Sequence, residues 1–559
     1  MEFLDARRLT GPSLMFDGPG SILDISCTPD EADKLIPVWS DHVTRMLEAL
    51  DWPSATFSSR QLLGGVSLAF SAPIDALYAA SEINEWAWSA SAFEFGAVAE
   101  KPDFEESLKA IRASAAEEAN AELMWLVDEA AAHGKTLLWD DDKVSVGLGC
   151  GSQTWSVGEI PDSLDWDSLH DVPVGIVTGT NGKTTTVRFA AHILQAAGKT
   201  VGMSSTDWIA VNGEVLDRGD WSGPGGARAV LREPTVDVAV LETARGGLLR
   251  RGLGVERADA ALITNISEDH LGDFGSRDLD ELLAVKWIVS RAVEASGRLI
   301  LNADDARLCA KSRDYKGELA WFSLDGGTET IKKHTAGGGL AFVLDGQELL
   351  KLDAGARELI CLSHEIPIAL GGAARHNVAN ALAAAAITWC LGASVADIRS
   401  GLTTMVQDEN PGRCNIYDLD GCKILVDFAH NPAAMSALFD MASVIPATRR
   451  VLCFGQAGDR TDELIRELAR DAWAIGLDHV VVSELAPYHR GREHGEVYGI
   501  IRDELLRLGA RPSQIAHFET EMESFMYAVD RVGPGDLIIM LALGGARPVQ
   551  EKLKAMGAR

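Results

Sequence analysis

The sequence predicts an α/β protein whose largest part is a central domain with a mostly parallel sheet. Between residues 172 and 410, short apolar runs alternate with helical segments, and a glycine-rich turn joins a strand to a helix at 175–186. Apolar runs separated by helices are typical of parallel sheets covered on both faces. We therefore expect an N-terminal α+β domain over residues 1–165, this central domain over 166–410, and a smaller C-terminal α/β domain over 411–559.

The N-terminal part combines four or five helical stretches with several strand-like runs and much of the tryptophan. Its end, residues 162–171, is polar and acidic and is interpreted as a linker. Four aromatic residues could bind a polymer, although packing in the core is the favoured interpretation: Trp86, Trp88, Phe93 and Phe95.

The elements of the other two parts follow from the apolar runs and their breaks. In the central part we expect strands at 174–178, 236–243, 258–265 and 298–302, and helices at 184–197, 279–295 and 376–391. The C-terminal part opens with a predicted hairpin, 415–419 and 423–428, around Asp420-Gly421. It continues with strands at 450–454, 478–483 and 536–542 and with helices that begin near Asp462 and Gly495.

Composition excludes several classes of protein. The 559 residues are 47% hydrophobic and carry a net charge of −31, which would repel a nucleic acid. No apolar run approaches the roughly 20 residues of a membrane span, and the first residues have no signal-peptide core, so we expect a cytoplasmic protein. The eight cysteines form no Cys-x-x-Cys pair, which predicts reduced thiols and no zinc site.

The glycine-rich turn predicts a phosphate-binding loop. Residues 175–186 read Gly-Ile-Val-Thr-Gly-Thr-Asn-Gly-Lys-Thr-Thr-Thr, and Val177 stands where the first glycine of the longer Walker pattern would be. Lys183 could neutralise the outer phosphates, and the Thr184 hydroxyl could hold Mg²⁺. The residues expected to bind the phosphates of ATP are Gly179, Thr180, Asn181, Gly182, Lys183, Thr184 and Thr185.

Two further candidates follow strands of the central part. Glu242 ends an apolar strand, where a carboxylate beside a nucleotide is a natural Mg²⁺ ligand, although a salt bridge to Arg245 or Arg250 is the structural alternative. His270 follows the next apolar strand, and chemistry alone leaves a catalytic and a structural role equally open for it.

Three candidates lie on predicted helices. Lys286 sits between Val285 and Trp287, and from the residues alone surface exposure is the favoured interpretation. Asn377 and Asn380 begin an alanine-rich helix, where they could contact the edge of an adenine or cap the helix.

The C-terminal part adds two candidates from its own pattern. Asp427 closes a strand and could accept hydrogen bonds from both ribose hydroxyls. Arg413 lies at the boundary between the two parts, where its guanidinium could meet phosphate oxygens or form a surface salt bridge.

Taken together, these stretches resemble the Mur ligase superfamily, and within it the Mur-ligase-like half of cyanophycin synthetases. The resemblance covers about residues 172–545 and rests on ordered motifs: 179–186, 241–250, 265–272, 410–413, 426–432, 458–462 and 490–496. It implies a central P-loop ATPase domain, a C-terminal Rossmann-like domain, and ATP-dependent formation of an amide or isopeptide bond through an acyl phosphate.

The resemblance also implies roles for single residues. Thr184, Glu242 and His270 match the Mg²⁺ ligands of the family. Lys286 matches a lysine that many Mur ligases carry as a carbamate, which reverses the surface interpretation and adds it to the metal and catalytic set, together with Lys183, Glu242 and His270. Asn377 and Asn380 match the adenine contacts, Asp427 the ribose contact, and Arg413 and His430 the phosphate side.

Two features separate this chain from cyanophycin synthetases. Those proteins carry an ATP-grasp module before the Mur-like part, but here residue 158 leads straight to residue 174. A separate ATP-grasp partner protein is therefore a hypothesis. Trp208 stands where the family has glycine, and Gly225-Gly226 stands where it has Trp-Ser, so the acceptor acid and the amine stay open.

The leading hypothesis is an ATP-dependent ligase that acts on amino-acid or peptide substrates, with a homo-oligomer expected from the resemblance. A poly-γ-glutamate or folylpolyglutamate ligase is an alternative within the same class. A non-catalytic nucleotide-binding subunit of a partner synthetase is the alternative from another class.

Overall fold

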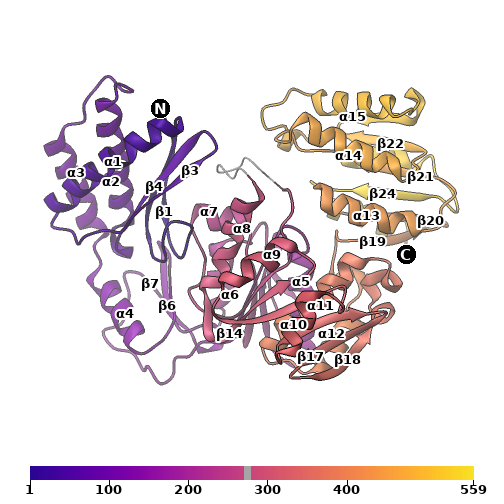
Figure 1. The fold of residues 1–559 in the computed structure, drawn as a ribbon, viewed down its shortest axis with the longest axis horizontal. Coiled ribbons are helices and arrows are strands. Elements are labelled where there is room, and N and C mark those ends of the chain that lie inside the picture. The colour runs from indigo at the N-terminus through magenta and orange to yellow at the C-terminus, as the bar shows by residue number, and fades with distance from the viewer. Residues whose placement is uncertain (270–277) are drawn as a thin grey trace.

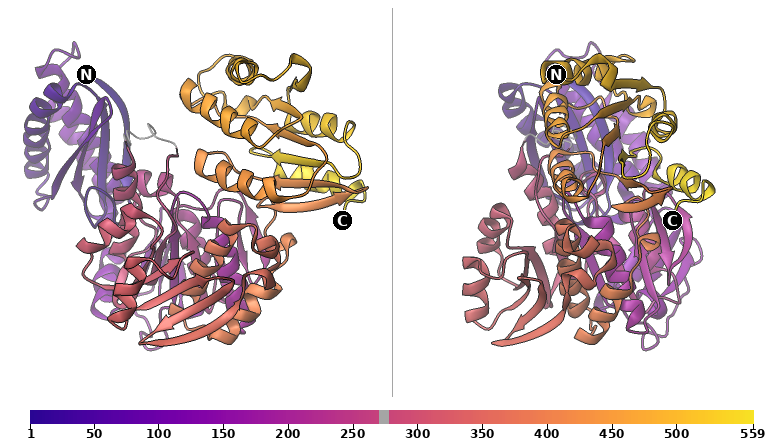
Figure 2. Two further views of the ribbon diagram at one scale, coloured as in Figure 1. Left: turned by 45° about the vertical axis from the view of Figure 1, so that its right-hand side comes forward. Right: turned by 90° about the vertical axis from the view of Figure 1, so that its right-hand side faces the viewer.

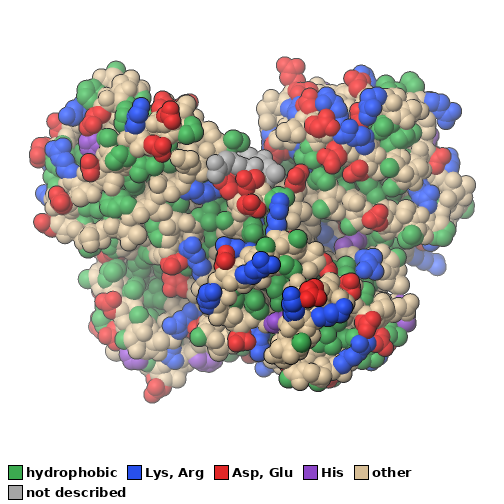
Figure 3. Space-filling view, in the orientation of Figure 1, with side chains coloured by type: hydrophobic (Ala, Val, Ile, Leu, Met, Phe, Trp, Pro, Cys, Tyr) green, Lys and Arg blue, Asp and Glu red, His purple; other side chains and the backbone are tan. Residues whose placement is uncertain are grey.

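The computed structural model describes residues 1–269 and 278–559. Figures 1 and 2 show a central part built around one large sheet, with the N-terminal and C-terminal parts attached to it on opposite sides. Figure 3 shows acidic and basic side chains interspersed over one face of the molecule. In the described ranges, no helix is long and apolar enough to cross a membrane.

The N-terminal part contains two antiparallel sheets and four helices. The first sheet has the order β1 (Glu2–Leu9), β2 (Gly20–Ser26), β4 (Gly65–Ser71) and β3 (Phe57–Leu62). The helices are α1 (Pro29–Ala49), α2 (Leu77–Glu94), α3 (Phe104–Glu118) and α4 (Ala121–Ala132), and the second sheet contains β5 (Leu137–Trp139), β6 (Lys143–Val146) and β7 (Gln153–Ser156). The mixture of helices and strands agrees with the α+β prediction.

The aromatic residues of helix α2 divide between the interior and the surface. Trp86 and Trp88 are buried in the core that the first sheet forms with its helices, as expected. Phe93 and Phe95 lie at the end of the helix and are 36% and 37% exposed, so the core interpretation is wrong for these two residues.

The central sheet has eleven strands, of which the inner seven are parallel. Its order is β11 (Glu214–Arg218), β10 (Trp208–Val211), β9 (Val201–Ser204), β12 (Val238–Glu242), β8 (Val174–Thr178), β13 (Ala258–Ile263), β14 (Val293–Asn302), β15 (Glu318–Ser323), β16 (Leu340–Asp345), β17 (Glu348–Asp353) and β18 (Ala356–Leu362). The two strands at each edge are antiparallel to their neighbours. This confirms the mostly parallel sheet, although β9 to β11 and β15 to β18 are absent from the predicted strands.

Helices cover both faces of this sheet, and each face has its own apolar core. One core joins the sheet to α5 (Lys183–Ala196), α11 (Arg375–Cys390) and α12 (Val395–Thr404). The other joins it to α6 (Pro224–Leu231), α7 (Arg245–Arg250), α8 (Leu279–Trp287), α9 (Ala306–Lys311) and α10 (Glu329–Ala336).

The helix predicted over 279–295 is too long. Helix α8 ends at Trp287, a single 3₁₀ turn covers Ile288–Arg291, and strand β14 already begins at Val293. Val293 pairs with Ala258 of β13. Residues 293–295 therefore belong to a strand, although the spacing of their apolar residues also suits a helix. A Cβ at Gly297 would lie 2.6 Å from the Asp259 carbonyl oxygen, so the strand requires glycine there for close pairing.

The C-terminal part is a six-stranded sheet with the order β19 (Asn415–Leu419), β20 (Cys422–Asp427), β24 (Leu537–Leu541), β21 (Arg450–Phe454), β22 (His479–Ser483) and β23 (Ile515–Phe518). Only β19 is antiparallel, and it forms the predicted hairpin with β20. Asp420 and Gly421 both have positive φ, at 51° and 83°, as a two-residue type I′ turn requires. Helices α13 (Pro432–Val444), α14 (Asp462–Ala474) and α15 (Glu496–Arg507) cover one face, and α16 (Glu521–Val529) and α17 (Ala546–Ala555) cover the other.

Polar contacts join the N-terminal part to the central part. The Thr10 amide donates to the Arg251 carbonyl oxygen at 2.8 Å, and Arg228 donates to the Thr10 hydroxyl at 3.0 Å. Arg232 forms an ion pair with Asp140. These contacts lie at the ends of β1 and β5, so the N-terminal part is held against helices α6 and α7 of the central part.

Candidate active site

The predicted phosphate loop lies at the carboxyl end of β8, between the ends of β12 and β13. Helix α5 begins at Lys183, and Gly182 at its N-cap has a φ of 86°. A Cβ at Gly182 would lie 2.2 Å from Asn380 Oδ1, and one at Gly179, whose φ is 141°, would lie 1.8 Å from Thr264 Oγ1. The loop therefore needs glycine at both positions. It leads directly into the first turn of the 14-residue helix α5, whose N–H groups could bind a phosphate at the loop.

The residues after β13 hold the loop in shape. The amides of Thr180 and Asn181 donate to the carbonyl and side-chain oxygens of Asn265, both at 2.9 Å. The Thr264 hydroxyl donates to the Asn181 carbonyl oxygen at 2.6 Å. These bonds fix the loop before any ligand arrives, which lowers the cost of binding one.

Thr184 and Glu242 meet directly. The Thr184 hydroxyl donates to Glu242 Oε2 at 2.9 Å, and Thr206 also bonds to both of these side chains. Glu242 is only 2% exposed at the end of β12. A hydroxyl and a carboxylate oxygen in one place form a donor set that suits Mg²⁺.

Lys183 and Lys286 both donate hydrogen bonds to carbonyl oxygens of the loop. Lys183 Nζ donates to the Thr180 carbonyl oxygen at 2.9 Å, and Lys286 Nζ donates to the Gly179 carbonyl oxygen at 2.7 Å. Lys286 is 3% exposed, so the surface interpretation from the residues alone is wrong. Burial, followed by the nearby charge of Lys183, holds the pKa of Lys286 well below its usual value.

His270 lies outside the described residues. Its neighbour Asp269 is described, and it lies 3.5 Å from Nε2 of His430 in the C-terminal part. His430 also has its Nδ1 3.0 Å from the Phe428 carbonyl oxygen. Over the described ranges, no three His, Cys, Asp or Glu side chains are grouped to hold a metal ion, while the predicted metal set also contains a threonine, a lysine and His270.

Asn377 and Asn380 are buried near the loop and do not cap the helix. Helix α11 begins at Arg375 with Ala374 at its N-cap, so the capping interpretation is wrong. The Asn377 side chain donates to the Ile368 carbonyl oxygen at 2.8 Å and accepts from Asn380 at 3.3 Å. Asn380 also approaches Gly182 of the loop, so the pair lies where the loop begins its helix.

Asp427 and Arg413 lie on the C-terminal side. The two carboxylate oxygens of Asp427 accept the amides of Cys414 and Ala429 at 2.6 and 2.7 Å. Arg413 lies 4.4 Å above the Phe428 ring and 3.4 Å from Asp207. Its guanidinium therefore pairs with a carboxylate of the central part across the boundary.

A reciprocal amide pair joins the phosphate loop to the C-terminal part. Asn431 donates to Asn181 Oδ1 at 2.8 Å, and Asn181 donates back to Asn431 Oδ1 at 3.2 Å. Both side chains thus have their oxygen and nitrogen satisfied by each other. The structure therefore brings the loop after β20 directly onto the predicted phosphate loop.

Arg188 is the main residue of this region that the sequence analysis missed. It is buried on α5, and it donates to Asp207 at 2.5 Å and to Asn410 Oδ1 at 3.0 Å. Burial lowers the pKa of Arg188 to about 10, while the carboxylate of Asp207 opposes that change. The available signal was a charged residue one turn after Thr184, between the apolar residues Val187 and Phe189.

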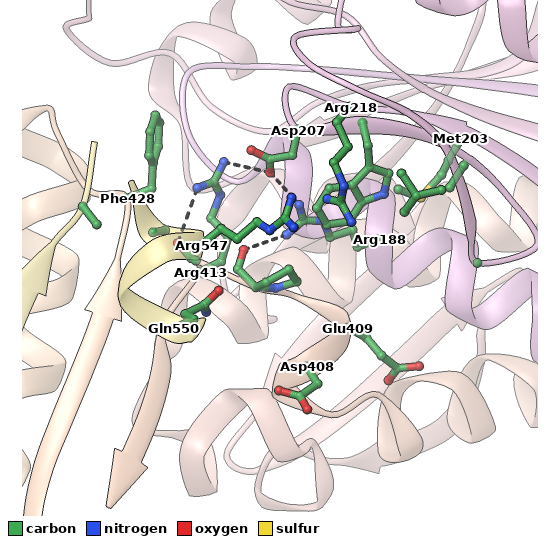
Figure 4. Close-up of a pocket in the computed structure, with 18 of the residues that line it drawn as sticks. Arg188, Met203, Asp207, Arg218, Asp408, Glu409, Arg413, Phe428, Arg547 and Gln550 are labelled. Carbon is green, nitrogen blue, oxygen red and sulfur yellow. Dashed lines mark hydrogen bonds and ion pairs between the residues drawn. The ribbon is translucent and has the colours of Figure 1, made fainter. Parts of the chain in front are cut away.

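A pocket of about 710 Å³ opens beside this cluster, between the β9 to β11 edge of the sheet, residues 405–413 and helix α17. Of the predicted site residues that the structure describes, only Arg413 lines it. Figure 4 shows Arg188, Arg218, Arg413 and Arg547 on the side of the pocket where Asp207 lies, with Asp408 and Glu409 apart from them. Asp207, which lines the pocket, directly follows Thr206 in the chain, and Thr206 bonds to Thr184 and Glu242.

Comparison with known proteins places most of this chain in one family. Residues 177–388 match the Mur ligase middle domain, and residues 412–544 match the Mur ligase glutamate ligase domain.

Full-length relatives and solved structures agree with these matches. Cyanophycin synthetase of Crocosphaera subtropica is 37% identical over 67% of this chain and 43% of its own length. Cyanophycin synthetase of Trichormus variabilis is 35% identical over 68% of this chain and 42% of its own length. The structure of E. coli FolC in complex with DHPP and ADP has a TM-score of 0.50 and 19% identity, over 68% of this chain and 89% of that one.

The matches differ in what they establish. The likeness to FolC concerns the fold alone, and the chain matches less than half the length of the two cyanophycin synthetases. The two matched domains, in contrast, follow one another along the chain and contain the phosphate loop, Glu242, Lys286, Arg413 and Asp427. Over residues 177–544, this chain therefore belongs to the Mur ligase family.

Proposed function

We propose that this protein is an ATP-dependent ligase that joins a carboxylate to an amine in an amide or isopeptide bond. The observation that carries the proposal is the meeting of Lys183, Thr184, Glu242 and Lys286 around one glycine loop, in a chain of the Mur ligase family. The loop, the helix N-terminus and Lys183 suit a triphosphate. The N–H groups of the loop and of the helix N-terminus could donate hydrogen bonds to the phosphates, and the charge of Lys183 could neutralise them.

The residues present fit a magnesium ion. Thr184 and Glu242 offer hard oxygen ligands at 2.9 Å from each other, and His270 is assigned to the same set by the family motif. When bound, Mg²⁺ would neutralise phosphate charge and orient the terminal phosphate. Lys286 would join this set as a carbamate, because carbamate formation needs the neutral amine that its lowered pKa favours.

The chemistry follows from the weakness of a carboxylate as an electrophile. An acceptor carboxylate oxygen attacks the γ-phosphorus of ATP, the bond to the β-phosphate oxygen breaks, and ADP and an acyl phosphate result. The amine then attacks the acyl carbon, phosphate leaves, and the amine proton passes to solvent or a nearby base. Lys183 and the loop amides counter the charge on the transferred group. Contact between the C-terminal part and the loop, through Asn181 and Asn431, would help to keep out water, which would otherwise hydrolyse the acyl phosphate.

The remaining site residues would bind the rest of the nucleotide. Asn377 and Asn380 are assigned to the adenine, Asp427 to the ribose, and Arg413 and His430 to the phosphates. Their positions on both sides of the Asn181–Asn431 pair support a nucleotide held between the central and C-terminal parts.

The substrates follow from the family at the level of amino acids or peptides. Between β7, which ends at Ser156, and β8, which begins at Val174, the structure has no helix or strand, so an ATP-grasp module has no place there. We therefore propose one kind of ligation for this chain, with a separate ATP-grasp partner if an alternating polymer is made. Assembly as a homo-oligomer is part of the same proposal.

The test is ADP release by the isolated chain with ATP, Mg²⁺ and a panel of amino acids and acidic peptides. We expect release that requires both an acceptor acid and an amine, and a loss of roughly 100-fold in Lys183→Ala. The matched control is Lys199→Ala, which changes an exposed lysine just beyond the far end of the same helix. Normal turnover in Lys183→Ala would refute the assignment, and nucleotide binding with no release on any substrate would favour a non-catalytic subunit.

A further inference from the structure

Helix α8, which carries Lys286, is held from the N-terminal part on both sides of this residue. In its first turn, the guanidinium of Arg60 on β3 donates to Glu281 Oε2 at 3.4 Å. Just beyond its end, Arg291 donates to the Ser13 carbonyl oxygen at 2.7 Å. The lysine therefore lies between two contacts with another part of the chain, five residues from each.

The contact at the start of the helix is the more enclosed of the two. The side chains of Arg60 and Glu281 are 19% and 15% exposed, whereas Asp17, which also pairs with Arg291 at 2.8 Å, is 80% exposed. Solvent and salt screen an ion pair less when its side chains are largely buried. We therefore expect Arg60 to be the stronger anchor, and the carbonyl of Ser13 to be the main partner of Arg291.

The loop between β1 and β2 also holds the neighbouring helix α7. The Thr10 amide donates to the Arg251 carbonyl oxygen at 2.8 Å, and the Leu253 amide donates to the Pro12 carbonyl oxygen at 2.7 Å. A Cβ at Gly11 would lie 2.3 Å from the Leu253 carbonyl oxygen, so this close approach requires glycine. Helices α7 and α8 share one apolar core, and Figure 1 shows both on the side of the central part that faces the N-terminal sheet.

The position of α8 decides where Lys286 meets the phosphate loop. Lys286 is buried, and its Nζ donates to the Gly179 carbonyl oxygen at 2.7 Å. Hydrogen bonds depend strongly on geometry, and a misplacement of about 1 Å at a reaction centre can cost on the order of 100-fold in rate. An anchor on α8 can therefore act on the reaction through the helix.

A second ion pair joins the same two parts without involving α8. Arg232, at the C-terminal end of α6, pairs with Asp140 and donates to the Lys143 carbonyl oxygen at 3.0 Å. Helix α6 contains none of the predicted site residues. Loss of this pair should therefore weaken the attachment of the N-terminal part and leave Lys286 in place.

We propose that the N-terminal part positions Lys286 for the reaction, and that Arg60 and Arg291 are the positioning residues through which it does so. The inference rests on the proposed ligase function, because that function gives Lys286 its role at the reaction centre. It assigns a task to the N-terminal part, which neither of the two matched family domains covers.

The experiment compares the full chain with Arg60→Gln, Arg291→Gln and the matched control Arg232→Gln by hydrogen–deuterium exchange and mass spectrometry. Exchange of the amides in residues 279–291 reports whether α8 is held, and it requires neither ATP nor a substrate. Urea denaturation of the same proteins measures how much each substitution lowers the overall stability. A local effect on α8 is thereby distinguished from a general loss of stability.

We expect residues 279–291 to exchange about two- to fivefold faster in Arg60→Gln than in the full chain, with a smaller increase in Arg291→Gln. Arg232→Gln should lower the stability to a similar extent and leave this exchange unchanged. The double variant that combines Arg60→Glu with Glu281→Arg should restore the slow exchange that Arg60→Glu alone loses. The proposal is overturned if Arg60→Gln and Arg291→Gln match the full chain, if Arg232→Gln accelerates the exchange of α8 equally, or if the exchanged charges restore nothing.

ADP release separates this inference from the proposed function. If the full chain releases ADP, Arg60→Gln should lower kcat about three- to tenfold and leave the KM for ATP unchanged, whereas Arg232→Gln should change neither. A kcat in Arg60→Gln equal to that of the control would overturn the role in the reaction. If none of the proteins releases ADP with any substrate, the ligase function fails, while the exchange data still show whether the N-terminal part holds α8.

Discussion

The phosphate loop lies at the carboxyl end of the inner strand β8 and the pocket beside the β9 to β11 edge of the same sheet, yet the two are built in opposite ways. Around the loop, Glu242 and Lys286 are almost fully buried, and the polar groups bond to one another. Among the charged side chains that line the pocket, only Arg188 is buried, whereas Arg218 is exposed and forms no ion pair with a carboxylate in the described part of the chain. In the first region the described polar groups are bonded to one another, and the second is open and has more basic than acidic side chains.

The difference between the two regions corresponds to two tasks, which are to carry out the reaction and to recognise the substrate. A reaction centre gains from groups that are fixed before the substrate arrives, because they need no rearrangement during the reaction. A recognition surface gains from exposed charges that can adapt to the substrate. Substitutions in the first region should therefore change turnover, and those in the second should change binding.

The largest expected effect is that of Glu242→Ala, which removes the carboxylate that Thr184 and Thr206 contact. We expect kcat for ADP release to fall by about 10²–10³-fold, or roughly 3–4 kcal/mol. The control is Glu318→Ala, which changes an exposed carboxylate on β15 of the same sheet. A change in KM without a change in kcat would show that Glu242 contributes to substrate binding rather than to turnover.

Substitution of Arg188 tests whether this buried side chain of the pocket stabilises the fold. Arg188→Ala leaves Asp207 and Asn410 without their shared partner, which should lower the free energy of unfolding by about 3 kcal/mol. Urea denaturation would measure this change. Arg188→Lys keeps the charge and should cost less, so equal losses in both variants would show that packing rather than charge holds the residue.

Lys286 should make activity depend on carbon dioxide and pH. Because its lowered pKa favours the neutral amine, we expect about tenfold lower activity in buffer free of carbon dioxide, restored by bicarbonate. Lys286→Ala should lose the bicarbonate response. Wild-type activity that ignores bicarbonate would argue against the carbamate.

The same residue predicts how stability varies with pH when the amine is unmodified. Burial lowers the folded-state pKa of Lys286 below 10.5, so the unfolded chain binds more protons between the two values. The free energy of unfolding should therefore rise with pH across that window, and Lys286→Met should reduce the slope. Urea denaturation at a series of pH values measures the slope, and an identical slope in the variant would contradict the prediction.

The smallest expected effect belongs to Trp208→Ala. Loss of the ring removes the contacts with Arg188 and Arg218, which are each worth about 0.5–1 kcal/mol at exposed sites. The KM for the acceptor acid should rise roughly two- to fivefold, with kcat unchanged. Tyr527→Ala, which removes an aromatic contact with Arg531 in the C-terminal part, should leave this KM unchanged.

Local features of this protein were predictable from the sequence. The strand, the glycine loop and the helix at 174–196 and the Asp420-Gly421 hairpin lie where they were expected. Such features depend on backbone conformations and hydrogen bonds between residues close in the chain. The order of the family motifs likewise identified the residues that surround the loop.

The tertiary structure alone decided how those features combine. Burial of Lys286, the early end of helix α8, and the pairing of Arg413 with Asp207 across 206 positions all depend on which strands become neighbours. A residue pattern records the preference of a short segment, whereas burial and charge pairing arise from segments that meet only after folding. The cationic pocket beside the phosphate loop is the clearest case, because its four arginines come from helices α5 and α17, strand β11 and the segment between the central and C-terminal sheets.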